Sequence, residues 1–339
     1  MASMGDMNSV EFPDLYTPAP NWTGRDDGSG EEHARWHTVI QPYNSEGGNA
    51  DDAVRPAVVL GYASDEGVER NGGRKGAASG PGALRDALAG LAIHDDLPRQ
   101  DAGTVTTQFD DLEESQAELS HRVADVIEAG NLCIVLGGGH ETAFASHRGA
   151  YQANGRQPLK IVNLDAHFDL READQPTSGT PFLQIADMVT ADHGDESFDY
   201  SVLGISRPNN TRVLFDTAER LGVHVVEDEE LVNLSPAQAG ELAAELAQQR
   251  HEDAPIHLSI DLDVMPADVA PGVSATASLG VSFEKIRAMA VALAATGRLA
   301  LVDVVELNPR YDVDQQTAKA AARLIADIVA AHATHATQR

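Results

Sequence analysis

Cysteine and lysine are nearly absent from this 339-residue sequence. Cys133 is the only cysteine, so no internal disulfide can form, and its place in the run LCIVLGG predicts a small buried residue. Lysine occurs only at Lys75, Lys160, Lys285 and Lys319, so arginine supplies nearly all the positive charge. With 53 acidic against 24 basic residues, the formal net charge is −29. Such a surface repels nucleic acid and anionic membranes, and we expect neither as a partner.

The acidic excess has two interpretations. It can serve solubility alone, or it can be an adaptation to high salt, where self-repulsion is screened and carboxylates retain water and cations. Scarce lysine together with abundant aspartate favours the second interpretation, a halophilic protein.

Long hydrophobic runs are also missing. No stretch approaches the roughly 18 consecutive apolar residues of a membrane span. The opening MASMGDMNSVEFPDLY has neither the basic start nor the apolar centre of a signal peptide. We therefore expect a cytoplasmic protein.

The sequence changes character near residue 50. Residues 1–50 are rich in Gly, Asp, Asn and Pro and show little periodicity, which predicts an N-terminal arm that is partly extended or disordered. Trp22 and Trp36 are the expected anchoring points of this arm. No linker interrupts residues 57–335 and no repeat appears, so we expect a single domain over residues 51–339.

Short apolar runs alternate with amphipathic, alanine-rich segments through the rest of the chain. Strands that are hydrophobic on both faces and separated by helices predict an α/β fold with a parallel sheet covered on both sides. The expected strands are 57–63, 132–138, 160–165, 201–206, 223–228, 255–263 and 299–307, with 102–107 as an eighth.

Polar side chains follow several of these strands. In open parallel sheets, ligands bind beyond the carboxyl ends of the strands, so these residues should share one crevice. Spacing of two also places side chains on one side of an extended segment. The residues concerned are His140 after the second run, then Asp165, His167 and Asp169, then Asp261 and Asp263, and finally Glu306.

Four aspartates and two histidines in one crevice predict a metal site. Without cations the acids would repel one another and be costly to desolvate, whereas two divalent ions balance four negative charges. Oxygen-rich ligation with imidazole and no thiolate favours manganese. Each group alone has a structural explanation, such as a glycine turn at His140 or capping by Asp261 and Asp263. Their joint occurrence at strand ends favours metal binding.

The motifs GGGHE, NLDAHFDLR, SIDLDVMPADVAPG and VVELNP resemble the signatures of the ureohydrolase superfamily, which includes arginase and agmatinase. The resemblance implies a three-layer α/β/α fold around a mostly parallel eight-stranded sheet, with two Mn²⁺ per subunit. It also implies that Asp165 and Asp261 bridge the metals. The remaining implied ligands are His140, His167, Asp169 and Asp263.

The resemblance further implies the chemistry. A metal-bridging hydroxide attacks the carbon of an amidine or guanidine, with Glu306 holding the substrate nitrogens and Asp169 relaying a proton to the leaving amine. The superfamily also implies a homo-oligomer, a trimer or hexamer.

One position departs from the arginase and agmatinase pattern and indicates which branch of the superfamily the sequence resembles. Arginases and agmatinases carry a histidine where this sequence has Ser178, within TSGTPFLQ. That stretch, together with WTGRDDGSGEEHARWH and NGGRKGAASGPGALR, resembles the formimidoylglutamase branch. The implied substrate is the small molecule N-formimidoyl-L-glutamate, cleaved to L-glutamate and formamide in histidine degradation.

A substrate with two carboxylates requires fixed cations in the pocket. Arg171 is the first candidate because a guanidinium pairs with a carboxylate in bidentate fashion. Further candidates for substrate binding are Ser178, Gly179, Arg74, Arg207 and Asn210, with Arg310 as a weaker one.

Alternative functions stay open at this point. The first is agmatinase or another amidinohydrolase that releases urea, and the second is a catalytically silent metal-binding relative. A deacetylase with a single zinc is a third.

Overall fold

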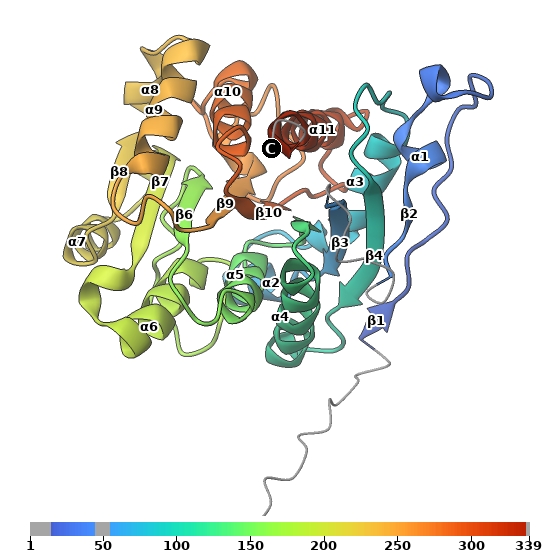
Figure 1. Ribbon diagram of the computed structural model, residues 1–339. Coiled ribbons are helices and arrows are strands. Elements are labelled where there is room, and N and C mark those ends of the chain that lie inside the picture. The colour runs from blue at the N-terminus through green and yellow to red at the C-terminus, as the bar shows by residue number, and fades with distance from the viewer. Residues whose placement is uncertain (1–14, 45–54, 337–339) are drawn as a thin grey trace, which may run out of the picture.

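The structure, a computed structural model, describes residues 15–44 and 55–336 (Figure 1). Eight strands of the described chain, β3 to β10, form a parallel sheet in the order β4-β3-β5-β10-β9-β6-β7-β8. These strands are β3 (Ala57–Ala63), β4 (Arg99–Thr106), β5 (Leu132–Leu136), β6 (Lys160–Leu164), β7 (Asp199–Ile205), β8 (His224–Glu227), β9 (Ile256–Asp261) and β10 (Leu299–Val305). The eight-stranded parallel sheet expected from the sequence is thus present.

Helices cover both faces of the sheet (Figure 1). One layer contains α3 (Gly80–Ala89), α9 (Pro236–Gln248), α10 (Phe283–Ala294) and α11 (Gln316–Ala336), with α8 (Asp228–Val232) beside α9. The opposite layer contains α4 (Leu112–Glu128), α5 (Thr142–Ala153), α6 (Pro181–His193) and α7 (Arg212–Arg220). Shorter helices are α1 (Trp36–Val39) and α2 (Glu66–Arg70), with 3-10 turns at Glu31–His33, Ala77–Ser79, Asp195–Ser197, Arg207–Asn209 and Leu262–Val264. The three-layer α/β/α architecture is confirmed.

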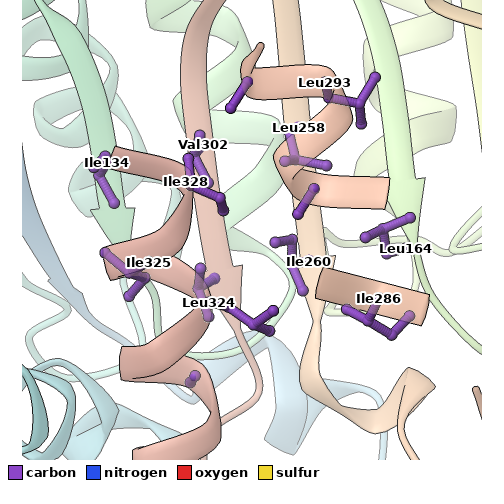
Figure 2. Packing of buried hydrophobic residues seen from close by; sticks show 14 of the residues in the cluster. Ile134, Leu164, Leu258, Ile260, Ile286, Leu293, Val302, Leu324, Ile325 and Ile328 are labelled. Atoms are coloured by element: carbon purple, nitrogen blue, oxygen red, sulfur yellow. The ribbon is translucent and has the colours of Figure 1, made fainter. Parts of the chain in front are cut away.

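Successive side chains of each strand point to opposite faces of the sheet, so the hydrophobic core consists of two clusters. In β5, Ile134 packs into the cluster shared with α9, α10 and α11, whereas Cys133 and Val135 pack into the cluster shared with α4, α5 and α6. Figure 2 shows the first cluster, in which Leu258 and Val302 of the sheet face the helices. Apolar residues on both faces explain why the strands read as continuous hydrophobic runs.

The described part of the N-terminal arm lies along the edge strand β4. Two-residue strands, β1 (Tyr16–Thr17) and β2 (Gln41–Pro42), both pair with β4, β1 antiparallel and β2 parallel. Trp22 stacks on the buried Trp36 and donates from Nε1 to Asp101 Oδ2 at 2.8 Å. The arm's two tryptophans therefore anchor it to the domain. Residues 1–14 and 45–50 of the expected arm lie outside the described residues.

Among the described residues, no helix has the length and apolar character needed to cross a membrane.

Candidate metal centre

The candidate site lies at the carboxyl edge of four adjacent strands, β5, β10, β9 and β6. His140 follows β5, Asp165 follows β6, Asp261 ends β9, and Glu306 follows β10. Because the strands are parallel neighbours, residues far apart in the sequence meet at one point.

Two local features of the chain shape this edge. Gly138 brings the end of β5 against the segment after β3: a Cβ at this position would lie 1.9 Å from the Ser64 carbonyl oxygen. Asp169 and Glu306 adopt positive φ values of 50° and 67°, which few residues other than glycine adopt. Backbone strain of this kind clusters at functional sites, where the surrounding structure enforces it.

His140 stands at the centre of the first half of the site. Its Nδ1 lies 2.9 Å from Asp169 Oδ2 and 3.2 Å from both Asp165 Oδ2 and Asp261 Oδ2. The imidazole is buried, and Nδ1 has no partner in hydrogen-bonding geometry among the described residues. One nitrogen thus has three carboxylate oxygens within 3.2 Å of it.

His167 forms the second half. Its Nδ1 lies 3.1 Å from Asp263 Oδ2 and 3.6 Å from Asp165 Oδ1. Asp165 therefore presents one carboxylate oxygen to each histidine. Both halves satisfy the spacing of a metal-binding group, and they share Asp165.

The electrostatics of the cluster favour a bound cation. Burial and the charges of Asp263 and Asp165 raise the pKa of Asp261 well above its usual value. Burial and Asp165 also raise the pKa of Asp169. Protons or metal ions must compensate these charges, because four carboxylates cannot remain ionised together without nearby positive charge.

The donor set fits two divalent ions. Buried atoms without hydrogen-bond partners in the described structure include His140 Nδ1 and Asp263 Oδ1, both placed as ligands. Imidazole and carboxylate ligands without thiolate suit manganese. The residues present therefore fit a pair of Mn²⁺, and the six predicted ligands are brought together.

A cavity of about 220 Å³ opens above these residues. Asp165 lies fully buried behind its wall. The predicted site residues that line the cavity are His140, His167, Asp169, Arg171, Ser178, Asn210, Asp261, Asp263 and Glu306.

Glu306 is buried but has one carboxylate oxygen available. Its Oε1 accepts from the His140 backbone N–H at 2.8 Å, whereas Oε2 has no hydrogen-bond partner among the described residues. Burial, and then the charge of Glu141, raises the pKa of Glu306 to about 8. A cationic ligand in the cavity would stabilise its ionised form.

Arg171 is the one arginine or lysine among the described residues that line the cavity. Its backbone N–H donates to the Gly179 carbonyl at 2.9 Å, and its guanidinium has no protein partner in the described structure. Gly179 lies directly behind it, because a Cβ there would approach Arg171 Cδ to 2.8 Å. Gly179 thus makes room for the arginine side chain.

The other arginine candidates lie outside the cavity lining. Arg74 donates to the Ser274 and Val273 carbonyls and stacks over Tyr311. Arg207 pairs with Glu227 on the surface. Arg310 is exposed and does not line the cavity either. Their contact with substrate stays a prediction; the structure shows that long side chains bond to whichever acceptors the tertiary fold brings near.

Asn210 lines the cavity, but its amide is already engaged. Oδ1 accepts from the Phe168 N–H, and Nδ2 donates to the Ala166 and Ser206 carbonyls. Its observed role is to hold the loop that carries His167.

Sequence reasoning missed part of the wall. Asn71 lines the cavity and donates from Nδ2 to Ser178 Oγ at 3.2 Å, and Ser274 belongs to the same lining. Asn71 opens the NGGRKGA stretch, and that motif was the available signal. Ser274 has no such signal.

A parallel sheet with these histidine and aspartate side chains at its carboxyl edge is typical of a metal-dependent hydrolase of the α/β class. A family model described as the arginase family matches residues 55–331, and the chain belongs to that family.

Individual relatives show which enzymes of this family the chain is similar to. The chain is 48% identical over 323 residues to formimidoylglutamase of Corynebacterium efficiens, covering 95% of this chain and 96% of that protein. It is 49% identical over 320 residues to formimidoylglutamase of Nocardia farcinica, covering 93% and 97%. The crystal structure of Trypanosoma cruzi formiminoglutamase with Mn²⁺ is similar with a TM-score of 0.74 and 26% identity, covering 83% of this chain and 94% of that chain.

Proposed function

We propose that this protein hydrolyses N-formimidoyl-L-glutamate to L-glutamate and formamide, in histidine degradation, with two Mn²⁺ per subunit. The observation that carries the proposal is the cavity in which Arg171 lies beside the His140 and His167 clusters. The named relatives support it, because they match nearly the whole chain at almost half identity.

Six side chains would hold the metals. His140 and Asp169 face one position, His167 and Asp263 face the other, and Asp165 faces both. Asp261 contacts the His140 side through Oδ2, and we propose that, like Asp165, it would be shared with the second metal. When bound, Mn²⁺ supplies positive charge for the acids and lowers the pKa of water enough to provide a nucleophile at neutral pH.

The protein's own residues orient the substrate. Glu306 Oε2, buried and without a protein partner in the described chain, accepts N–H bonds from the formimino group. Such charge-assisted bonds are stronger than neutral ones and hold the electrophilic carbon in place.

Proton movement completes the reaction. Water adds to the formimino carbon, the bond from that carbon to the glutamate nitrogen breaks, and formamide leaves. Asp169 lines the cavity and can take the proton from the water and deliver it to the departing nitrogen. The glutamate amine is thereby restored.

Arg171 and Ser178 recognise the glutamate part. The guanidinium of Arg171 has no acid partner in the described structure, so a substrate carboxylate can occupy it in bidentate fashion. Ser178 supplies a hydroxyl to the same wall. An agmatine-like substrate offers no carboxylate to this arginine, and the cation at the wall disfavours it.

A product assay tests the proposal. Metal-stripped protein is reloaded with Mn²⁺ and given N-formimidoyl-L-glutamate, agmatine or arginine. Formamide from the first substrate alone supports the proposed function. Urea from either of the others supports an amidinohydrolase instead, and no product from any supports a silent metal-binding relative.

We further propose that the enzyme works in a salty cytoplasm as a homotrimer or hexamer. The net charge of −29 supports the high-salt part, because screening relieves self-repulsion in the compact state. Unfolding midpoints measured from low to molar KCl should rise, and light scattering should give three or six subunits. Falling midpoints or a monomer would contradict this proposal.

A further inference from the structure

A network of buried polar side chains lies behind His140 at the metal site. His140 Nε2 is 2.9 Å from Ser259 Oγ, and the Ser259 hydroxyl donates to Asp303 Oδ1. Ser259 and Asp303 are direct partners in the register of β9 and β10. Both are fully buried, and neither lines the cavity. Among the described residues, the hydrogen bonds of this network reach the metal site through His140.

Asp303 is held as an acceptor from several sides. Its Oδ2 receives the Ser146 hydroxyl at 2.8 Å and contacts His257 Nε2 at 2.6 Å. His257 Nδ1 in turn contacts His147 Nδ1 at 3.1 Å. Burial works to raise the pKa of Asp303, but His257 and the surrounding donors outweigh it and hold the pKa below its usual value. Asp303 is thus an ionised carboxylate.

The direction of each hydrogen bond follows from this charge. An ionised carboxylate only accepts, so the Ser259 proton points to Asp303. The Ser259 oxygen can then only accept from His140, which places the imidazole proton on Nε2. Nδ1, the atom that faces the three carboxylates, is then the nitrogen whose lone pair would be offered to a metal ion.

We propose that Asp303, acting through Ser259, is a positioning residue that fixes the tautomer and ring orientation of His140 and so sets the metal affinity on its side of the site. This inference rests on the metal centre of the proposed function. In metal sites, the partners of ligating histidines fix the tautomer in the same way. His167 is partly exposed, and its Nε2 contacts no carboxylate among the described residues; both of its acidic neighbours lie at Nδ1.

Substitutions at Asp303 and Ser259 test the inference. In Asp303→Asn, the new amide can donate to Ser259, which frees the hydroxyl to donate to His140 Nε2 and moves the imidazole proton to Nδ1. Ser259→Ala removes the acceptor while leaving the carboxylate. Calorimetric titration of the metal-stripped full chain with Mn²⁺ should show affinity about 10- to 100-fold weaker at one of two sites, the other being retained.

Nitrogen-15 spectra of the metal-free protein report whether each nitrogen of the His140 ring carries a proton. The His140 signals, assigned with His140→Gln, should show a proton on Nε2 in the wild type and not in Asp303→Asn. Cys133→Ala is the matched control: it is buried on β5, beside β10, and makes no hydrogen bond to Ser259, Asp303 or His140 among the described residues. It should bind both ions with wild-type affinity.

The outcomes separate this inference from the function on which it depends. Two sites of wild-type affinity in both variants, or an unchanged tautomer in Asp303→Asn, overturn the positioning role. If Asp303→Asn fails to fold, Ser259→Ala decides, because it removes one buried oxygen only. A wild-type protein that binds fewer than two ions would instead overturn the metal centre itself.

Discussion

Asp165 Oδ2 lies 3.2 Å from His140 Nδ1, and both side chains are buried at the carboxyl edge of the sheet. The same carboxylate turns its other oxygen to His167, at 3.6 Å. One residue therefore joins the two halves of the site, which makes its loss more damaging than the loss of a ligand on one side.

Asp165→Asn should release both metals. An amide carries no negative charge, so both halves of the site lose a ligand. Mutating a residue that only hydrogen-bonds to a metal ligand costs about 10- to 100-fold, so we expect the loss of this ligand to lower activity by at least about 100-fold. Metal content per subunit, measured by mass spectrometry, should fall from two towards zero. Asp174→Asn, an exposed acid in the following loop, is the control and should keep both ions. Full metal content in Asp165→Asn would refute the shared-ligand role.

Arg171→Ala should mainly raise KM. A hydrogen bond to a charged group contributes about 1.5–3 kcal/mol, which corresponds to roughly 10- to 150-fold in KM with kcat largely kept. Steady-state kinetics with N-formimidoyl-L-glutamate give both parameters. Arg207→Ala removes an arginine that pairs with Glu227 outside the cavity and should behave as wild type. Unchanged KM in Arg171→Ala would show that the substrate carboxylates bind elsewhere.

Glu306 should make the metal-free protein less stable as the pH rises. Its pKa is raised from 4.5 to about 8 by burial and by Glu141. Because the folded pKa exceeds the unfolded one, its stabilising contribution is complete below about pH 4.5 and is lost as the pH rises through about 8. Urea denaturation with a chelator, from about pH 5 to 9, should show a smaller decline for Glu306→Gln than for wild type. Glu113→Gln, at a partly exposed position on α4, is the control. An equal fall in unfolding free energy in wild type and Glu306→Gln would contradict the raised pKa of Glu306.

Gly138→Ala should destabilise the fold and weaken metal binding together. The added Cβ would lie 1.9 Å from the Ser64 carbonyl oxygen, so the segment after β3 must move away from the turn that carries His140. Overpacking of this kind costs about 1–3 kcal/mol or more. In contrast, Gly82→Ala on α3 meets nothing within 4 Å and should gain about 0.5–1 kcal/mol. Thermal unfolding and Mn²⁺ titration of both variants provide the measurement, and equal stabilities would argue against a tight turn.

Much of the site could be predicted from the sequence because its pattern is local. Asp165, His167 and Asp169 are spaced by two and follow an apolar run, and this position after a strand was enough to predict where they lie. Strand alternation is not what brings them together, because β6 ends at Leu164 and Asp169 has a φ of 50°, so the conformation of the loop does so. Parallel strands bring His140 and Asp261 to the same edge.

Tertiary structure alone decided which arginine faces the cavity. Arg74 finds its acceptors at Ser274, 200 positions away, and Arg207 finds Glu227, so both guanidinium groups already have protein partners. Their sequence surroundings did not distinguish them from Arg171, because a long side chain takes its partners from distant segments.

The hydrogen bonds of Ser259 and Asp303 behind His140 also depend on tertiary structure. Ser259 and Asp303 lie on different strands, and only the register of β9 with β10 places them side by side. The sequence by itself determined the strands, the spacing of the acids and the kind of metal that they suit. Strand order and register determined which buried groups touch, because such contacts depend on non-local packing that no short motif contains.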